Sequence, residues 1–139
     1  IKAVESTMEV PDNWADIIIS NHALEHTERP LDEVRRLWHK LKPGGKIVFV
    51  VPCESLTYAY APKDINQHLY SWSPMCLGNL FGQANFEVIE SLPFIHKWPP
   101  NYVVIVQKFG WKFFHMIARL YARWETTWYQ VRVVAKKPA

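Results

Sequence analysis

Two short apolar runs separated by an amphipathic segment dominate the first third of the chain. Residues 14–20 read WADIIIS and residues 46–51 read KIVFVV, and turn-forming residues bound both runs. Short, continuous β-branched runs of this kind are typical of strands buried on both faces. Between them, apolar residues recur at helical spacing over residues 31–41, which predicts an amphipathic helix. The order strand, helix, strand with short connections indicates parallel strands and an α/β fold.

Proline and glycine mark where the first helix begins and ends. Pro30 stands at the expected first helical position, and Lys42-Pro43-Gly44-Gly45 follows the last apolar residue of the pattern. Proline is favoured at the first position of a helix because its missing N–H is not needed there. Glycine is favoured just after the end of a helix because it adopts left-handed backbone freely. The helix is therefore confined to about residues 30–41.

The remaining elements are predicted from weaker patterns. Ser73-Pro74 predicts a capped helix that reaches about residue 85. Residues 86–91 alternate like a strand, residues 102–124 look helical in their second half, and residues 128–136 read as a last strand. Residues 1–5 are a weak strand candidate. We expect a single domain over residues 1–139, with a long loop at 52–72 and a helical insertion at 92–127 before the last strand.

Composition and charge narrow the classes of function. The 139 residues are 49% hydrophobic and 14% aromatic, which indicates a globular chain and not a disordered one. A net charge of +3 is too mild to indicate a dedicated nucleic-acid binder. Cys53 and Cys76 form no CxxC pair and are expected to be free thiols in a reducing compartment. With no secretory leader and no apolar run of spanning length in view, we expect a cytoplasmic location.

Residues 14–52 carry an ordered set of short motifs. Asp16 opens an apolar strand, Leu24-Glu25-His26 forms a turn, and Leu41-Lys42-Pro43-Gly44-Gly45 precedes a second strand that ends at Pro52. In this order the motifs resemble those of the class I S-adenosylmethionine-dependent methyltransferases, in particular the methyltransferase type 11 family. The resemblance implies a truncated Rossmann-like sheet, in which parallel strands are joined by an antiparallel last strand and helices lie on both faces.

Residues 68–90 look like the next helix and strand of that family. Where the family has glycine before an aromatic corner, this chain has Asn85 before Phe86, and asparagine tolerates left-handed backbone better than most residues. The glycine-rich loop of the family's first strand is absent, since the five glycines are Gly44, Gly45, Gly78, Gly82 and Gly110. The resemblance therefore implies the C-terminal part of a methyltransferase domain, without two strand-helix units.

The resemblance also implies which residues meet the methyl donor, S-adenosylmethionine. Glu5 or Ser6 would contact the adenine, and Ser20, Asn21 and His22 would lie beside the methionine portion. These positions follow strands whose carboxyl ends form the ligand-binding edge of open α/β sheets. His68, in the long loop that faces the acceptor in the family, is the candidate base for a proton leaving the acceptor.

The spacing of His22, Glu25 and His26 also suggests a metal site, because residues four apart share one face of a helix. The segment is not an HExxH motif and shows no third ligand nearby, so no metal centre is expected. Glu25 and His26 are instead expected to fix their turn through hydrogen bonds.

Three functions remain open at this point. The first is an S-adenosylmethionine-dependent methyltransferase, or a fragment of one, that acts on an unidentified small-molecule or lipid acceptor. The second is an inactive methyltransferase-like domain that acts through assembly, as a homodimer or with a missing N-terminal portion, because an open sheet edge invites pairing. The third is contact with a membrane surface through the basic, aromatic residues 102–124.

Overall fold

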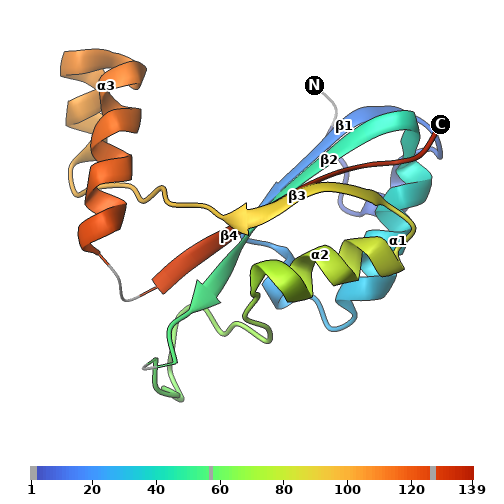
Figure 1. The fold of residues 1–139 in the computed structure, drawn as a ribbon, viewed down its shortest axis with the longest axis horizontal. Helices are drawn as coiled ribbons and strands as arrows, with labels where there is room; N and C mark the ends of the chain where they lie inside the picture. The colour runs from blue at the N-terminus through green and yellow to red at the C-terminus, as the bar shows by residue number, and fades with distance from the viewer. Residues whose placement is uncertain (1–2, 57, 126–127) are drawn as a thin grey trace.

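A four-stranded mixed sheet forms the centre of the computed structural model, which describes residues 3–56, 58–125 and 128–139 (Figure 1). The strands are β1 (Ala15–Asn21), β2 (Leu41–Glu54), β3 (Glu87–Pro93) and β4 (Trp128–Lys136). Their spatial order is β1-β2-β4-β3. β1 and β2 are parallel, whereas β4 runs antiparallel to both β2 and β3. The predicted α/β class with an antiparallel last strand is confirmed.

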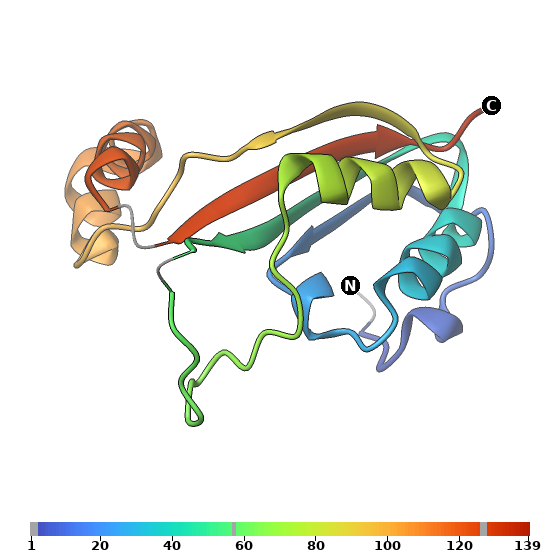
Figure 2. The same cartoon turned by 60° about the horizontal axis from the view of Figure 1, so that its bottom comes forward.

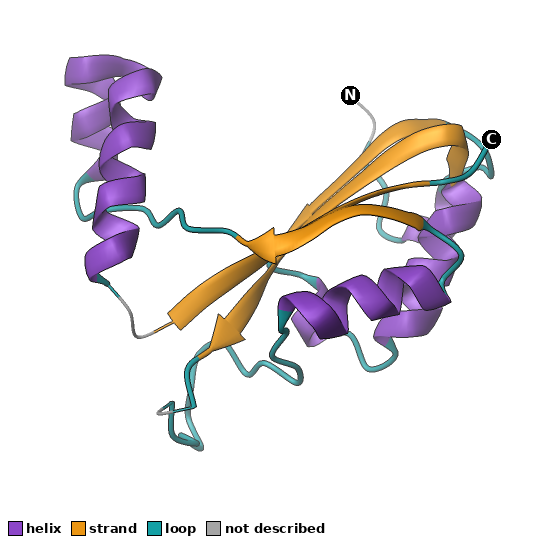
Figure 3. Cartoon of the chain, in the orientation of Figure 1, coloured by secondary structure: helices purple, strands orange, loops and turns teal. Residues whose placement is uncertain are grey.

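Helices cover the two faces of the sheet unequally. The described helices are η1 (Thr7–Glu9), η2 (Leu24–His26), α1 (Pro30–Lys40), α2 (Pro74–Gln83) and α3 (Tyr102–Trp124). α1 and α2 lie on the same face, and α3 stands beyond one end of the sheet (Figures 2 and 3). The expected helices on both faces are therefore present only in part, since α3 alone borders the second face.

The hydrophobic core lies between the sheet and the pair α1 and α2. Alternate residues of β2, namely Ile47, Phe49 and Val51, point into it, and Phe81 of α2 packs on Phe49 with ring centroids 5.4 Å apart. Each such buried side chain contributes roughly 1.5–3 kcal/mol relative to an exposed one. The register Phe49↔Val133 places the inward residues of β4 on the same face.

The opposite face and the outer edge of β1 are open. Ile17 and Ile19 point away from the core and are 54% and 72% exposed. Among the described residues no strand pairs with the outer edge of β1. The isoleucine run at residues 17–19 therefore does not form a strand buried on both faces, as the sequence predicted, because only one face has a covering layer here.

The predicted strand at residues 1–5 is wrong for its described part. Residues 3–5 adopt no strand, and residues 1–2 lie outside the described residues. A strand needs a neighbour, and the segment finds none. It leads instead into η1, where the Ser6 hydroxyl accepts from the Met8 N–H and the Glu9 carboxylate accepts from the Ser6 N–H.

Local features of the later elements agree with the sequence. Ser73 caps α2, with its hydroxyl accepting from the Cys76 N–H at 3.1 Å. Asn85 takes the left-handed backbone expected of it, with φ of 68°. β4 has the predicted bounds. Cys53 and Cys76 are free thiols.

α3 is longer than the sequence predicted. It begins at Tyr102, before the second half of the segment, and its direction changes at Gly110, where φ is 78° and ψ is 171°. A glycine can adopt this backbone without the clash that a Cβ would bring. No helix of the described residues is long and apolar enough to cross a membrane.

Candidate functional site

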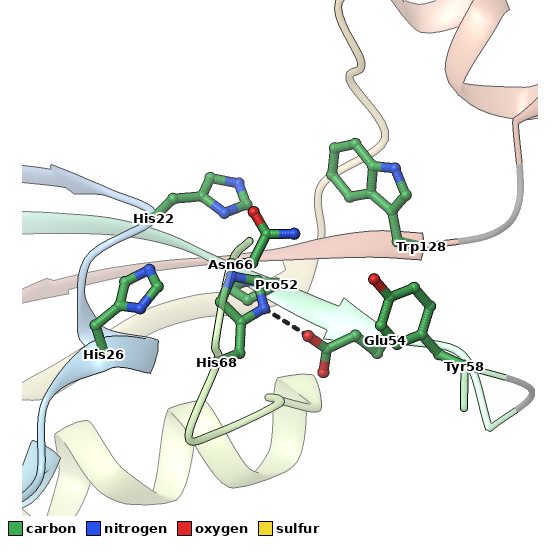
Figure 4. Close-up of a pocket in the computed structure, with 8 residues that line it drawn as sticks. All are labelled: His22, His26, Pro52, Glu54, Tyr58, Asn66, His68 and Trp128. Atoms are coloured by element: carbon green, nitrogen blue, oxygen red, sulfur yellow. Dashed lines mark hydrogen bonds and ion pairs between the residues drawn. The ribbon is translucent and has the colours of Figure 1, made fainter. Parts of the chain in front are cut away.

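Two hollows lie side by side at the carboxyl ends of β1 and β2. The smaller is a cavity of about 340 Å³, which we call the histidine cavity, lined by His22, His26, Pro52, Glu54, Tyr58, Asn66, His68 and Trp128 (Figure 4). The larger is a groove of about 890 Å³, here the α3 groove, which lies between the open sheet face at Ser20 and Asn21 and the aromatic side of α3. The carboxyl ends of parallel strands are where open α/β sheets bind ligands.

Backbone hydrogen bonds hold the long loop against this edge. The Leu69 N–H donates to the Glu25 carbonyl at 2.9 Å, and the Trp72 N–H donates to the Pro52 carbonyl at 3.0 Å. The first bond fixes the residue after His68 directly on η2. Gln67, the residue before His68, has left-handed backbone with φ of 48°. The loop is therefore bent so that His68 faces the end of β1, although 46 positions separate it from His22 in the chain.

His68 is bound on one side by a carboxylate. Its Nδ1 lies 2.6 Å from Glu54 Oε1, and the two side chains are only 17% and 20% exposed. A carboxylate accepts and cannot donate, so Nδ1 carries the proton of this bond. The neutral ring then has its lone pair on Nε2, which lies 3.9 Å from Glu25 Oε1. The arrangement orients His68 and leaves its second nitrogen as a base or a ligand.

Glu25 is a fully buried carboxylate at the back of the site. Among the described residues no hydrogen bond of regular geometry reaches either of its oxygens. The nearest group is His22 Nδ1 at 3.2 Å. Burial alone would raise the pKa of Glu25, but the approach of His22, the backbone of the turn and the nearby His68 lower it, and the net pKa shift is downward.

Backbone hydrogen bonds close the turn that carries Glu25. The His26 N–H bonds the Ala23 carbonyl, and the Thr27 hydroxyl and N–H both bond the Leu24 carbonyl. These bonds close η2 without the Glu25 or His26 side chains. Of these two side chains, Glu25 contacts His22 Nδ1 at 3.2 Å across the turn, and His26 lines the cavity.

The six sequence-predicted residues fall into three places. His22 and His68 line the histidine cavity together. Ser20 and Asn21 line the α3 groove. Ser6 caps η1 and Glu5 precedes it, and neither residue lines the histidine cavity or the α3 groove.

Sequence reasoning missed several side chains of the cavity. Glu54 ends β2, and its position at a carboxyl strand end is the signal that could have identified it. Gln130 Nε2 lies 2.7 Å from His22 Nε2, and Trp128 packs edge-on to His22 with ring centroids 6.3 Å apart. Both come from β4, which is 106 or more positions away in the sequence, so no local pattern could place them there.

Comparison with known proteins identifies a family that this chain matches. A family model described as a methyltransferase domain matches residues 2–91. A search of curated protein sequences gives no match.

Solved structures of larger proteins share the fold. The cyclase SpnF has a TM-score of 0.62 at 17% identity, covering 99% of this chain and 56% of its own. A methyltransferase in complex with the Trm112 activator of Haloferax volcanii has a TM-score of 0.62 at 18% identity, with 93% and 56% covered. Phosphoethanolamine N-methyltransferase 2 of Haemonchus contortus, solved with S-adenosylhomocysteine, has 0.59 at 15% identity, with 92% and 34% covered. The chain thus spans about half or less of the length of these three structures.

Proposed function

The chain belongs to the methyltransferase family, and from this premise we propose that it is an S-adenosylmethionine-dependent methyltransferase or a fragment of one. The observation that carries the proposal is the meeting of β1, β2 and the loop before α2 at one edge, with a cavity and a groove side by side. Such an edge is where the fold binds ligands. The structure of the Haemonchus contortus relative, which holds S-adenosylhomocysteine, supports S-adenosylmethionine as the donor.

The donor would bind at the end of β1. Ser20, Asn21 and His22 supply a hydroxyl, an amide and an imidazole there, and these groups suit the charged amino and carboxylate ends of the methionine portion. Glu5 or Ser6 is proposed for the adenine. A complete S-adenosylmethionine site would need protein contacts beyond these residues.

The acceptor would occupy the histidine cavity. Its volume of about 340 Å³ suits a small molecule or the headgroup of a lipid. The acceptor's nucleophilic atom forms a bond to the methyl carbon as the bond from that carbon to sulfur breaks, leaving S-adenosylhomocysteine. Where the acceptor is a hydroxyl, its proton passes to Nε2 of His68. Glu54 and Glu25 flank that ring at 2.6 Å and 3.9 Å, and their negative charge stabilises the imidazolium that forms.

Donor binding tests this proposal. Calorimetric titration of S-adenosylmethionine into the chain should give one-site binding, which Asn21→Ala weakens. The matched control is His39→Ala, an exposed change near the end of α1, which should leave the affinity unchanged. Absence of binding at millimolar donor, or equal binding by both variants, would contradict the proposal.

Assembly is the second candidate function, and the open edge of β1 favours it. Ile17 and Ile19 expose apolar surface beside backbone groups that no described strand pairs. A second copy, or a further segment that extends the sheet, would cover both. The activator bound to the Haloferax volcanii relative supports partner assembly in this fold. Light scattering tests the homodimer: a monomer at high protein concentration would contradict it.

We also propose a cytoplasmic location. Cys53 and Cys76 remain free thiols, which suits a reducing compartment. Localisation of a tagged chain by cell fractionation tests this, and recovery in an oxidising compartment would contradict it.

A further inference from the structure

The back of the histidine cavity has the ligands of a metal site. Glu25, His26 and His68 each offer one ligand atom, and these atoms all lie within 4.8 Å of one another. We propose that these three side chains bind a divalent transition-metal ion of the zinc type. The sequence did not predict this site, because its third ligand comes from a loop 42 positions beyond His26.

The Glu25 carboxylate is in an unusual state for a buried charge. It is fully buried, yet neither oxygen has a hydrogen bond of regular geometry among the described residues. Buried charges in proteins are ordinarily paired, hydrogen-bonded or bound to metal. Among the described residues, the ion pairs of Glu25 are with imidazole nitrogens, the nearest being His22 Nδ1 at 3.2 Å, and none is with a lysine or arginine. A metal cation between Glu25, His26 and His68 would give the carboxylate a permanently charged partner.

The spacing of the ligand atoms is close to that of a metal site. His26 Nε2 lies 4.0 Å from Glu25 Oε1, and His68 Nε2 lies 3.9 Å from the same oxygen. These distances are too long for hydrogen bonds. Tetrahedral ligands at ~2.0–2.1 Å from zinc lie about 3.3 Å apart, so small side-chain rotations would bring the three atoms around one ion.

His68 has the carboxylate partner that is common for a metal-binding histidine. Metal-binding histidines usually donate their second ring N–H to a carboxylate, which fixes the tautomer and makes the ligating nitrogen more basic. Glu54 Oε1 lies 2.6 Å from His68 Nδ1 and therefore serves this purpose (Figure 4). The ring nitrogen that remains, Nε2, is the one that faces Glu25.

The ligand set decides the kind of ion. Two imidazoles with one carboxylate suit zinc and its transition-metal neighbours, whereas magnesium and calcium prefer oxygen ligands. Three protein ligands leave a fourth position toward the cavity, as in zinc sites that bind water or a substrate. The inference does not rest on methyl transfer. A bound ion would occupy Nε2 of His68, the same atom that would accept the acceptor's proton. His68 therefore cannot bind the ion and act as the base at the same time.

Cobalt and zinc titrations of the full 139-residue chain test the site. After treatment with a chelator, Co²⁺ should bind at one equivalent and give the visible absorption of a coordinated ion, and Zn²⁺ should displace it. His26→Ala and His68→Ala should each weaken binding by at least about tenfold, and Glu54→Gln, which keeps all three ligands, by ~10–100-fold. Mg²⁺ should not compete.

A rival pair of histidines provides the matched control. His96 Nε2 lies 3.1 Å from His115 Nδ1 beside α3, so this pair could also take up metal. Replacing exposed His115 with alanine removes one imidazole outside the cluster and should leave the affinity unchanged. Circular dichroism of each variant shows that it is folded, and His26, which is 45% exposed, is the replacement least able to disturb the fold.

Three results would overturn the proposal. They are no Co²⁺ spectrum at 100-fold excess, loss of binding in His115→Ala, or undiminished binding in the folded His26→Ala variant. The metal titrations measure spectra and metal affinities and do not require S-adenosylmethionine. A failure to bind S-adenosylmethionine would therefore leave the metal proposal untouched.

Discussion

Replacing Gly45 with alanine should destabilise the sheet in the first part of β2. An added Cβ would lie 2.8 Å from the Lys42 carbonyl oxygen, 3.0 Å from a Leu41 methyl carbon and 3.2 Å from the Asp16 carbonyl oxygen. Two of these three neighbours are backbone atoms, which cannot rotate away. Overpacking of this kind typically costs about 1–3 kcal/mol, and the fixed carbonyls favour the upper half of that range.

Two other glycines separate steric crowding from backbone preference. Gly44 has φ of +75° with open space around it, so Gly44→Ala should cost ~1–2 kcal/mol through left-handed backbone alone. Gly82, in α2, has neither constraint, and Gly82→Ala should be neutral or stabilising by up to about 1 kcal/mol. Gly45→Ala is therefore expected to be the least stable of the three variants.

Urea unfolding followed by tryptophan fluorescence measures these differences. For a chain of this size a loss of 2–3 kcal/mol corresponds to a melting temperature lowered by roughly 6–12 °C. If Gly45→Ala unfolds at the urea concentration of the parent chain, the close approach of Gly45 to Asp16 at the start of β1 is not a constraint. If Gly82→Ala is equally damaging, alanine at glycine positions is harmful for some other reason.

Three further changes test separate parts of the structure. Asn85→Ala should cost ~1–2 kcal/mol because its φ is 68°, while Asn85→Gly should be nearly neutral; equal stabilities in urea would refute the left-handed corner. Ser73→Ala should cost about 1 kcal/mol by removing the cap of α2, and Ser73→Asp should retain most of it; thermal unfolding decides. Ile19→Lys should reduce self-association in light scattering without lowering the melting temperature, and undiminished association would exclude this face as the contact.

Much of the fold could be predicted because its signals are local. The cap at Ser73, the left-handed corner at Asn85 and the proline at the start of α1 each depend on neighbours a few positions away. The last strand was predicted with its observed bounds from an aromatic and valine-rich run without glycine or proline.

The predictions that were wrong depend on which elements pack against or pair with a segment. The isoleucine run looked buried on both faces, yet Ile17 and Ile19 are exposed, since burial depends on a covering layer and not on the strand's own residues. The segment at residues 3–5 contains β-branched Val4, but among the described residues it pairs with no strand. α3 begins eight residues before Gly110, because glycine there redirects the helix instead of preventing it from forming.

The site could be predicted only residue by residue. His22 and His68 were each identified, but their meeting depends on the hydrogen bond from Leu69 to Glu25, which has no signature in the sequence. The same bond brings His68 to Glu25 and so creates the metal ligand set. Glu54 was missed because a lone glutamate after a strand looks like an ordinary surface residue until its 2.6 Å contact with His68 is seen.

The central claim is that the carboxyl ends of β1 and β2 bind the methyl donor. Titration of the ¹⁵N-labelled chain with S-adenosylhomocysteine, followed by amide NMR shifts, tests it most directly. The claim predicts saturable shifts at Ser20, Asn21 and His22, with none at Gly44 or Lys46 at the opposite end of β2. Absence of shifts at millimolar ligand, or shifts confined to the end of the sheet that carries Gly44, would contradict it.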